Sequence, residues 1–147
     1  MTQNDFMLLA LETSKKALPQ CLPNPPVGCV IVRDGKVVAT GYTHQPGCAH
    51  AEVDALAKLA GSLEGCEMYV TLEPCSFTGR TPSCAKEIIK RKVGRLYVSI
   101  IDPHVRNNGK GIEIIERATI PVSTGLCETE VSAFLSPYLN PSSPPST

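Results

Sequence analysis

The chain has 147 residues, and the 42% that are hydrophobic can bury a core, which argues against disorder throughout. At this length we expect one domain, over residues 1–139. Fourteen basic residues balance fourteen acidic ones, which argues against a nucleic-acid partner, because phosphate contacts usually need a basic surplus.

The N-terminal segment of the chain reads MTQNDFMLLALETSKKAL. Its apolar run is interrupted by Glu12 and followed by Lys15 and Lys16, the reverse of a signal peptide. The sequence also lacks a run of about 18 apolar residues, the length that crosses a membrane. We therefore expect a cytoplasmic protein without membrane contact. The seven cysteines are an odd number, which favours thiols or metal ligands over a disulfide framework.

The first half of the chain predicts a helix, a hairpin and a second helix. Apolar residues at helical spacing predict a helix over 5–18, with Asn4 as its N-cap, and the proline-rich PQCLPNPP ends it. The β-branched run VGCVIV (27–32) predicts a strand, and the Asp-Gly in RDGK predicts a hairpin turn to VVATGY (37–42). The loop THQPGC then leads to a helix over about 50–60.

The second half alternates strands and helices. In order we expect a strand at 67–72, a helix at 83–92, a strand at 95–101, a helix at 111–118, a strand at 120–125 and a helix at 127–139. This order predicts an α/β protein in which a mixed five-stranded sheet lies between helix layers, a three-layer α/β/α arrangement. The Pro/Ser-rich tail, residues 140–147, should be disordered.

Three residues have the chemistry of a catalytic zinc site. His50 stands at a helix start, Cys75 follows the strand end TLEPC, and Cys84 falls in the first turn of the next helix, with eight residues between the cysteines. Catalytic zinc takes three ligands of this kind and leaves a fourth position open. Helix N-termini also favour thiolates. Cys48 is the rival that could close the site as a fourth ligand.

Glu52 is the predicted general acid/base. It lies two residues after His50, so its carboxylate can lie beside the open position without binding the metal. It would take a proton from the water and deliver it to a ring nitrogen and the leaving amine. The order His-x-Glu then Pro-Cys matches zinc deaminases, which favours hydrolysis of a cyclic amidine C–N bond with release of ammonia.

Four segments together resemble one known family. PNPPVGCVIVRDGKVVATGY, HAEVDAL, YVTLEPCSFTGRTPSC and DPHVRNNGKGI are similar to the deaminase domain of the bifunctional riboflavin-biosynthesis deaminase/reductase, in the cytidine-deaminase-like superfamily. The resemblance implies a cytidine-deaminase-like fold and Zn²⁺ held by His50, Cys75 and Cys84. It implies that the substrate is 2,5-diamino-6-(phosphoribosylamino)pyrimidinone. It also implies assembly into a homo-oligomer.

The resemblance also implies substrate contacts. Asn24 would hydrogen-bond the pyrimidine, and Arg80 would face the ribityl or phosphate end, since a guanidinium suits phosphate. The usual pattern differs at three loops, where this chain has Thr43 followed by His44, Phe77 in place of a histidine, and His104 in DPHV.

The three differences leave alternatives open. They predict a less polar ligand surface, so a related base, nucleoside or pteridine-like metabolite, such as one of a natural-product pathway, is an alternative substrate. A zinc-stabilised interaction module without catalysis is the alternative of another class, although it would not need Glu52.

Overall fold

The computed structural model describes residues 1–79 and 82–139; Arg80 and the predicted disordered tail 140–147 lie outside the described residues. The helices are α1 (Gln3–Ser14), α2 (Ala51–Leu56), α3 (Cys84–Lys90), α4 (Lys110–Arg117) and α5 (Glu128–Leu135), with short 3₁₀ helices at Lys15–Ala17 and Ser136–Tyr138. The strands are β1 (Gly28–Arg33), β2 (Lys36–Tyr42), β3 (Cys66–Leu72), β4 (Arg95–Ile100) and β5 (Val122–Thr124).

The five strands form one mixed sheet in the order β2-β1-β3-β4-β5. β1 is antiparallel to both β2 and β3, whereas β3, β4 and β5 run parallel. The hairpin turn has Asp34 and Gly35 at φ of 52° and 74°, the conformation for which Asp-Gly is favoured. The predicted mixed five-stranded sheet is confirmed.

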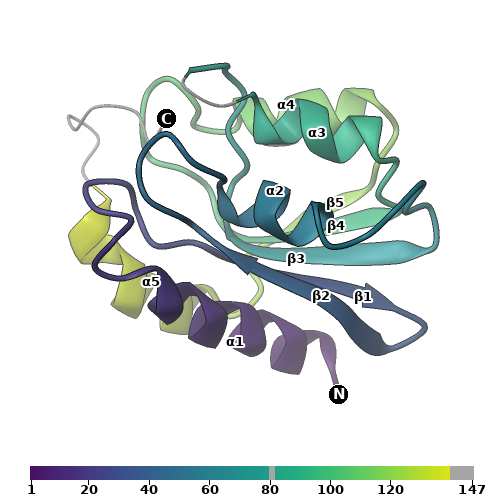
Figure 1. Cartoon of the computed structure of the whole chain (residues 1–147), viewed down its shortest axis with the longest axis horizontal. Coiled ribbons are helices and arrows are strands. Elements are labelled where there is room, and N and C mark those ends of the chain that lie inside the picture. Colours follow the sequence, from purple (N-terminus) through teal and green to yellow (C-terminus); the bar gives the residue numbers. More distant parts are fainter. Residues whose placement is uncertain (80–81, 140–147) are drawn as a thin grey trace.

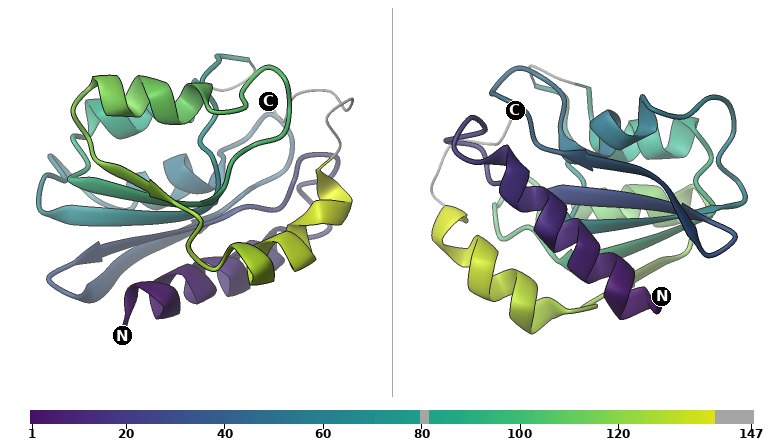
Figure 2. Two further views of the ribbon diagram at one scale, coloured as in Figure 1. Left: turned by 180° about the vertical axis from the view of Figure 1, so that it is seen from behind. Right: turned by 60° about the horizontal axis from the view of Figure 1, so that its bottom comes forward.

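Helices cover both faces of this sheet. α1 and α5 lie side by side on one face, and α2, α3 and α4 lie on the other (Figures 1 and 2). β1 and β3 are buried on both faces, as expected for central strands. Between α1 and the sheet, the core includes Phe6 and Met7 of α1 and Tyr69 of β3. The three-layer α/β/α prediction is therefore confirmed. In the described part of the chain, none of the helices has the length and apolar character needed to cross a membrane.

Several helix ends differ from the sequence prediction: α1 ends at Ser14 and not at 18, and α5 ends at Leu135 and not at 139, each followed by a short 3₁₀ helix. Two further differences have a clear polar cause. α1 is capped by Thr2, not Asn4: the Thr2 hydroxyl accepts from the Asp5 N–H, and the Asp5 carboxylate accepts from the Thr2 N–H. α2 ends at Leu56 instead of near residue 60. The Arg91 guanidinium donates to the carbonyl oxygens of Leu56, Leu59 and Gly61 at 2.7–2.9 Å, which stabilises a turn in place of further helix.

Candidate active site

The three predicted metal ligands converge from three different elements. His50 is the N-cap of α2, Cys75 follows β3, and Cys84 is the first residue of α3. Their ligand atoms all lie within 4.8 Å of one another, and all three residues are buried. The sequence places them here because β3 and the starts of α2 and α3 meet at one end of the sheet (Figure 1).

The contacts within this cluster prepare a thiolate. His50 Nδ1 lies 3.4 Å from Cys84 Sγ and 3.9 Å from Cys75 Sγ, and the Cys84 N–H donates to Cys75 Sγ at 3.2 Å. The hydrogen bond from the Cys84 thiol lowers the pKa of Cys75 to about 5, with His50 and the Cys84 N–H acting in the same direction. That same bond raises the pKa of the Cys84 thiol, and burial adds to the rise.

The donor set fits zinc. One imidazole nitrogen and two sulfur atoms are ligands that zinc prefers, and three protein ligands leave a fourth position for water. The rival ligand Cys48 is exposed and is not part of the cluster; its Sγ lies 3.7 Å from Gln45 Nε2. The cluster is thus an open centre of the catalytic type.

Glu52 lies beside the cluster. It is in the first turn of α2, is 4% exposed, and lines a cavity of about 30 Å³ together with His50 and Cys75. Burial raises the pKa of Glu52 to about 7, and the charge of Cys75 adds to this effect. A carboxyl group with a pKa near neutrality can both accept and donate a proton at that pH.

Two carboxylates in this cavity were not among the predicted site residues. The full lining is Pro25, Val27, Thr43, His50, Glu52, Leu72, Glu73, Cys75 and Asp102. Glu73 follows β3 and Asp102 follows β4. The carboxyl ends of neighbouring parallel strands meet at one edge of a sheet, so strand order was the signal that could have found this pair. Burial raises the pKa of Asp102.

Of the predicted substrate contacts near the hairpin, Thr43 lines the cavity, Asn24 lies next to it in the chain, and His44 lies outside it. Thr43 lines the cavity, and its hydroxyl accepts from the Val27 N–H at 3.1 Å. Asn24 is buried, directly before the cavity residue Pro25. His44 does not line this cavity. Its ring stacks on Tyr42, and its Nε2 lies 3.2 Å from Asp54 Oδ2. His44 instead borders a separate cavity of about 250 Å³.

Phe77 and His104 are likewise not among the residues that line the cavity. The Arg106 guanidinium lies 4.2 Å from the Phe77 ring centroid. The His104 N–H donates to Asp102 Oδ1 at 3.0 Å, and its Nδ1 accepts from the Arg106 N–H at 3.1 Å. The Phe77–Arg106 contact joins the loop after Cys75 to the loop after β4, whereas the two His104 hydrogen bonds lie within the loop after β4. Arg80 lies outside the described residues.

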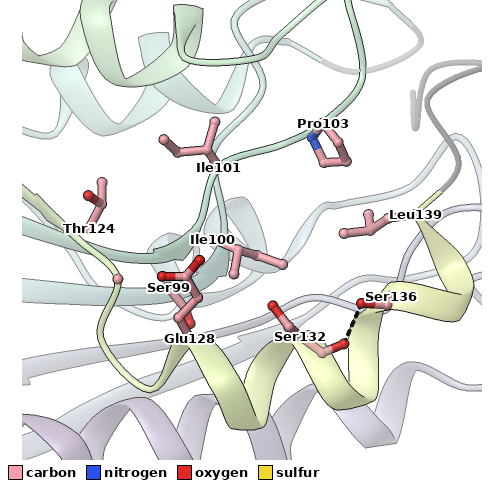
Figure 3. A pocket seen from close by; sticks show the side chains of 10 residues that line it. Ser99, Ile100, Ile101, Pro103, Thr124, Glu128, Ser132, Ser136 and Leu139 are labelled. Carbon is pink, nitrogen blue, oxygen red and sulfur yellow. Dashed lines mark hydrogen bonds between the residues drawn. The ribbon is translucent and has the colours of Figure 1, made fainter.

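A larger cavity, of about 410 Å³, lies between α5 and the carboxyl ends of β4 and β5 (Figure 3). It shares no lining residue with the cavity at Glu52. Ser99 borders it with a buried hydroxyl that has no hydrogen-bond partner among residues 1–79 and 82–139, whereas the Ser136 hydroxyl donates to the Ser132 carbonyl of α5 at 2.6 Å (Figure 3). None of the predicted site residues in the described part of the chain lines this larger cavity.

The chain resembles known proteins over most of its length. Residues 1–100 match the family described as the cytidine and deoxycytidylate deaminase zinc-binding region. The chain is 44% identical over 126 residues to the riboflavin biosynthesis protein RibD of Aquifex aeolicus, covering 86% of this chain and 35% of that relative. It is 41% identical over 129 residues to the diaminohydroxyphosphoribosylamino-pyrimidine deaminase of Buchnera aphidicola, covering 88% of each.

Solved structures extend the likeness to three dimensions. RibD from Acinetobacter baumannii matches with a TM-score of 0.88 at 39% identity, over 92% of this chain and 38% of that chain. The chain therefore spans little more than a third of the RibD relatives. Because the family match over residues 1–100 includes His50, Cys75 and Cys84, the chain belongs to the cytidine and deoxycytidylate deaminase zinc-binding family.

Proposed function

We propose that this chain is a zinc-dependent deaminase that acts on a diaminohydroxyphosphoribosylamino-pyrimidine and releases its 2-amino group as ammonia. The observation that carries the proposal is the buried Glu52 in one small cavity with His50 and Cys75, two of the three residues of the open cluster. The substrate class is supported by the Buchnera deaminase, which this chain matches over 88% of both lengths. We also propose, as expected from the sequence, that the protein is cytoplasmic and forms a homo-oligomer.

His50, Cys75 and Cys84 would hold the zinc ion. Two thiolates and a neutral imidazole offset its charge. When bound, zinc would lower the pKa of a water molecule at the fourth position and so supply the nucleophile. The cavity of about 30 Å³ has room for about one water molecule, so we place the pyrimidine ring at its mouth.

Glu52 moves the protons in this scheme. Its carboxylate accepts a proton from the attacking water, and the carboxylic acid then gives that proton to the ring nitrogen. Glu52 then takes the second proton from the hydroxyl group that has been added to the ring carbon and gives it to the amino group. The bond from the carbon to this nitrogen breaks, ammonia leaves, and a carbonyl remains on the ring. The Glu52 carboxyl group is buried and lines the cavity that has room for about one water molecule, which is the position that a proton carrier needs.

The test is ammonia release from a panel of substrates. The panel contains the riboflavin intermediate, cytidine, cytosine, guanine and related pterins, each with wild type and Glu52→Gln. We expect release from the riboflavin intermediate, and a rate about 10²- to 10⁴-fold lower for Glu52→Gln at unchanged zinc content.

Each other outcome has a definite meaning. Release from a different member of the panel would replace the substrate but keep the chemistry. Zinc binding without release from any member would favour the interaction module. Full activity of Glu52→Gln would refute the proton-transfer scheme for every substrate.

A further inference from the structure

Asn107 is a buried amide in the loop between β4 and α4, outside the motifs that indicated the metal site. Its exposed fraction is 0%. Asn107 Nδ2 donates to the Pro74 carbonyl at 3.1 Å, and Asn107 Oδ1 accepts from the Ser76 N–H at 3.1 Å. Pro74 and Ser76 are the residues directly before and after Cys75, so one side chain holds the backbone on both sides of a ligand.

These two bonds bear on the direction of the Cys75 side chain. The Pro74 carbonyl belongs to the peptide plane before the Cys75 Cα, and the Ser76 N–H belongs to the plane after it. The orientations of the two planes set φ and ψ of Cys75, and thereby the direction of its Cβ and Sγ. The opposite edge of the second plane is held too, because the Cys75 carbonyl accepts from the Ser83 hydroxyl at 2.9 Å.

The loop that carries Asn107 is itself firmly attached to this segment. The Glu73 carboxylate accepts from the N–H groups of Asp102, Gly109 and Ile112 at 2.8–3.1 Å. A Cβ on Gly111 would lie 2.0 Å from the Pro74 carbonyl oxygen, so the two segments are in direct backbone contact. Asn107 therefore acts from a fixed support.

We propose that Asn107 is a positioning residue of the metal centre, which holds Cys75 in the direction needed to bind zinc. Only a side chain with both a donor and an acceptor can serve the Pro74 carbonyl and the Ser76 N–H together, and an amide has both. Residues that orient metal ligands typically contribute about 10- to 100-fold in metal affinity. The proposal rests on the zinc site of the proposed function, and it is independent of which substrate is used.

The test measures the zinc dissociation constant by competition with a chromophoric chelator. Asn107→Asp keeps an acceptor for Ser76 and loses the donor to Pro74, whereas Asn107→Leu loses both at similar size. Asn108→Asp is the matched control, because it makes the same chemical change at the neighbouring, exposed residue. We expect zinc binding to be about 10- to 100-fold weaker for both Asn107 variants and unchanged for Asn108→Asp.

The control also separates geometry from charge and from folding. Both Asp variants add one negative charge, which by itself would attract zinc, so weaker binding by Asn107→Asp alone reports lost geometry. The melting temperature of each zinc-free protein shows whether that variant is folded at the assay temperature. If Asn107 had only a structural role, its substitution would lower the melting temperature without changing the zinc affinity of the folded protein. Asn107→Asp with the zinc affinity of Asn108→Asp would overturn the proposal, even if Asn107→Leu does not fold. Loss of ammonia release with any substrate would not bear on it.

Discussion

Cys84 and Cys48 differ sharply at the scale of single residues. Cys84 Sγ is buried 3.4 Å from His50 Nδ1, whereas the Cys48 thiol is exposed outside the cluster. We expect Cys84→Ala to lose stoichiometric zinc, since two remaining ligands hold zinc weakly. Cys48→Ala should keep one zinc per chain. Elemental analysis after gel filtration measures both, and an unchanged zinc content in Cys84→Ala would remove this residue from the ligand set.

The Phe77 ring does not line the small cavity but contacts the side chain of Arg106. The Arg106 guanidinium lies 4.2 Å from its centroid, a cation–π contact worth about 0.5–1 kcal/mol at an exposed position. We expect Phe77→Leu and Arg106→Gln each to lower the free energy of unfolding. A double-mutant cycle should give a coupling of about 0.5–1 kcal/mol between them. Strict additivity in urea unfolding would show that the two residues do not stabilise each other.

The cluster of metal ligands could be predicted from the sequence, whereas the residues that hydrogen-bond the backbone around it could not. The spacing of His50, Glu52, Cys75 and Cys84 at element starts and ends was enough to indicate one site. Asn107 gave no such signal, because its partners are main-chain groups of a loop about thirty residues earlier. The direction in which a loop side chain turns depends on its neighbours in space.

At the scale of elements, Gly41 in β2 allows α2 to approach the sheet. A Cβ on Gly41 would lie 2.3 Å from the Ala51 carbonyl oxygen and 2.5 Å from the Ala55 nitrogen. We expect Gly41→Ala to displace α2 and lower the free energy of unfolding by about 3 kcal/mol or more, the upper end for overpacking. His50 begins α2, so zinc affinity should fall as well.

Gly65→Ala is the matched control for this substitution. Nothing lies within 4 Å of a Cβ at Gly65, so its melting temperature and zinc content should stay close to wild type. Differential scanning calorimetry and metal analysis of the two variants provide the comparison. Equal melting temperatures would mean that α2 can shift without cost and that the close contact does not fix His50.

The order of the elements could be predicted because the hydrophobic period changes clearly between strands and helices. Several helix ends could not be predicted, and the structure gives the reason for two of them. The end of α2 depends on Arg91, which reaches three carbonyl oxygens from the C-terminal end of α3. The start of α1 depends on Thr2 and Asp5, a capping box that precedes the apolar pattern. Both are decided by polar side chains, to which the apolar pattern is insensitive.

For the whole molecule, the site is where separate parts of the chain meet. α2 follows the β1–β2 hairpin, and α3 follows β3. The loop after β4 is hydrogen-bonded to the segment around Cys75 through the side chains of Glu73 and Asn107. The ligands therefore come together only when the sheet and its upper helix layer have formed (Figure 1). An unfolded chain holds the three ligands far apart, so zinc should bind the folded state in strong preference.

That preference predicts how stability depends on zinc. A ligand specific to the folded state stabilises it by about 4 kcal/mol when its free concentration is 1,000 times the dissociation constant. Removal of zinc from wild type by a chelator, in a reductant that keeps the thiols free, should therefore lower the melting temperature by on the order of 10 °C for a chain of this size. Cys84→Ala, which lacks a ligand from α3, should melt at the same temperature with and without the chelator. If wild type lost its zinc and still melted unchanged, then zinc would contribute chemistry to a site that is fully formed without it, and the cluster would owe its geometry to the protein alone.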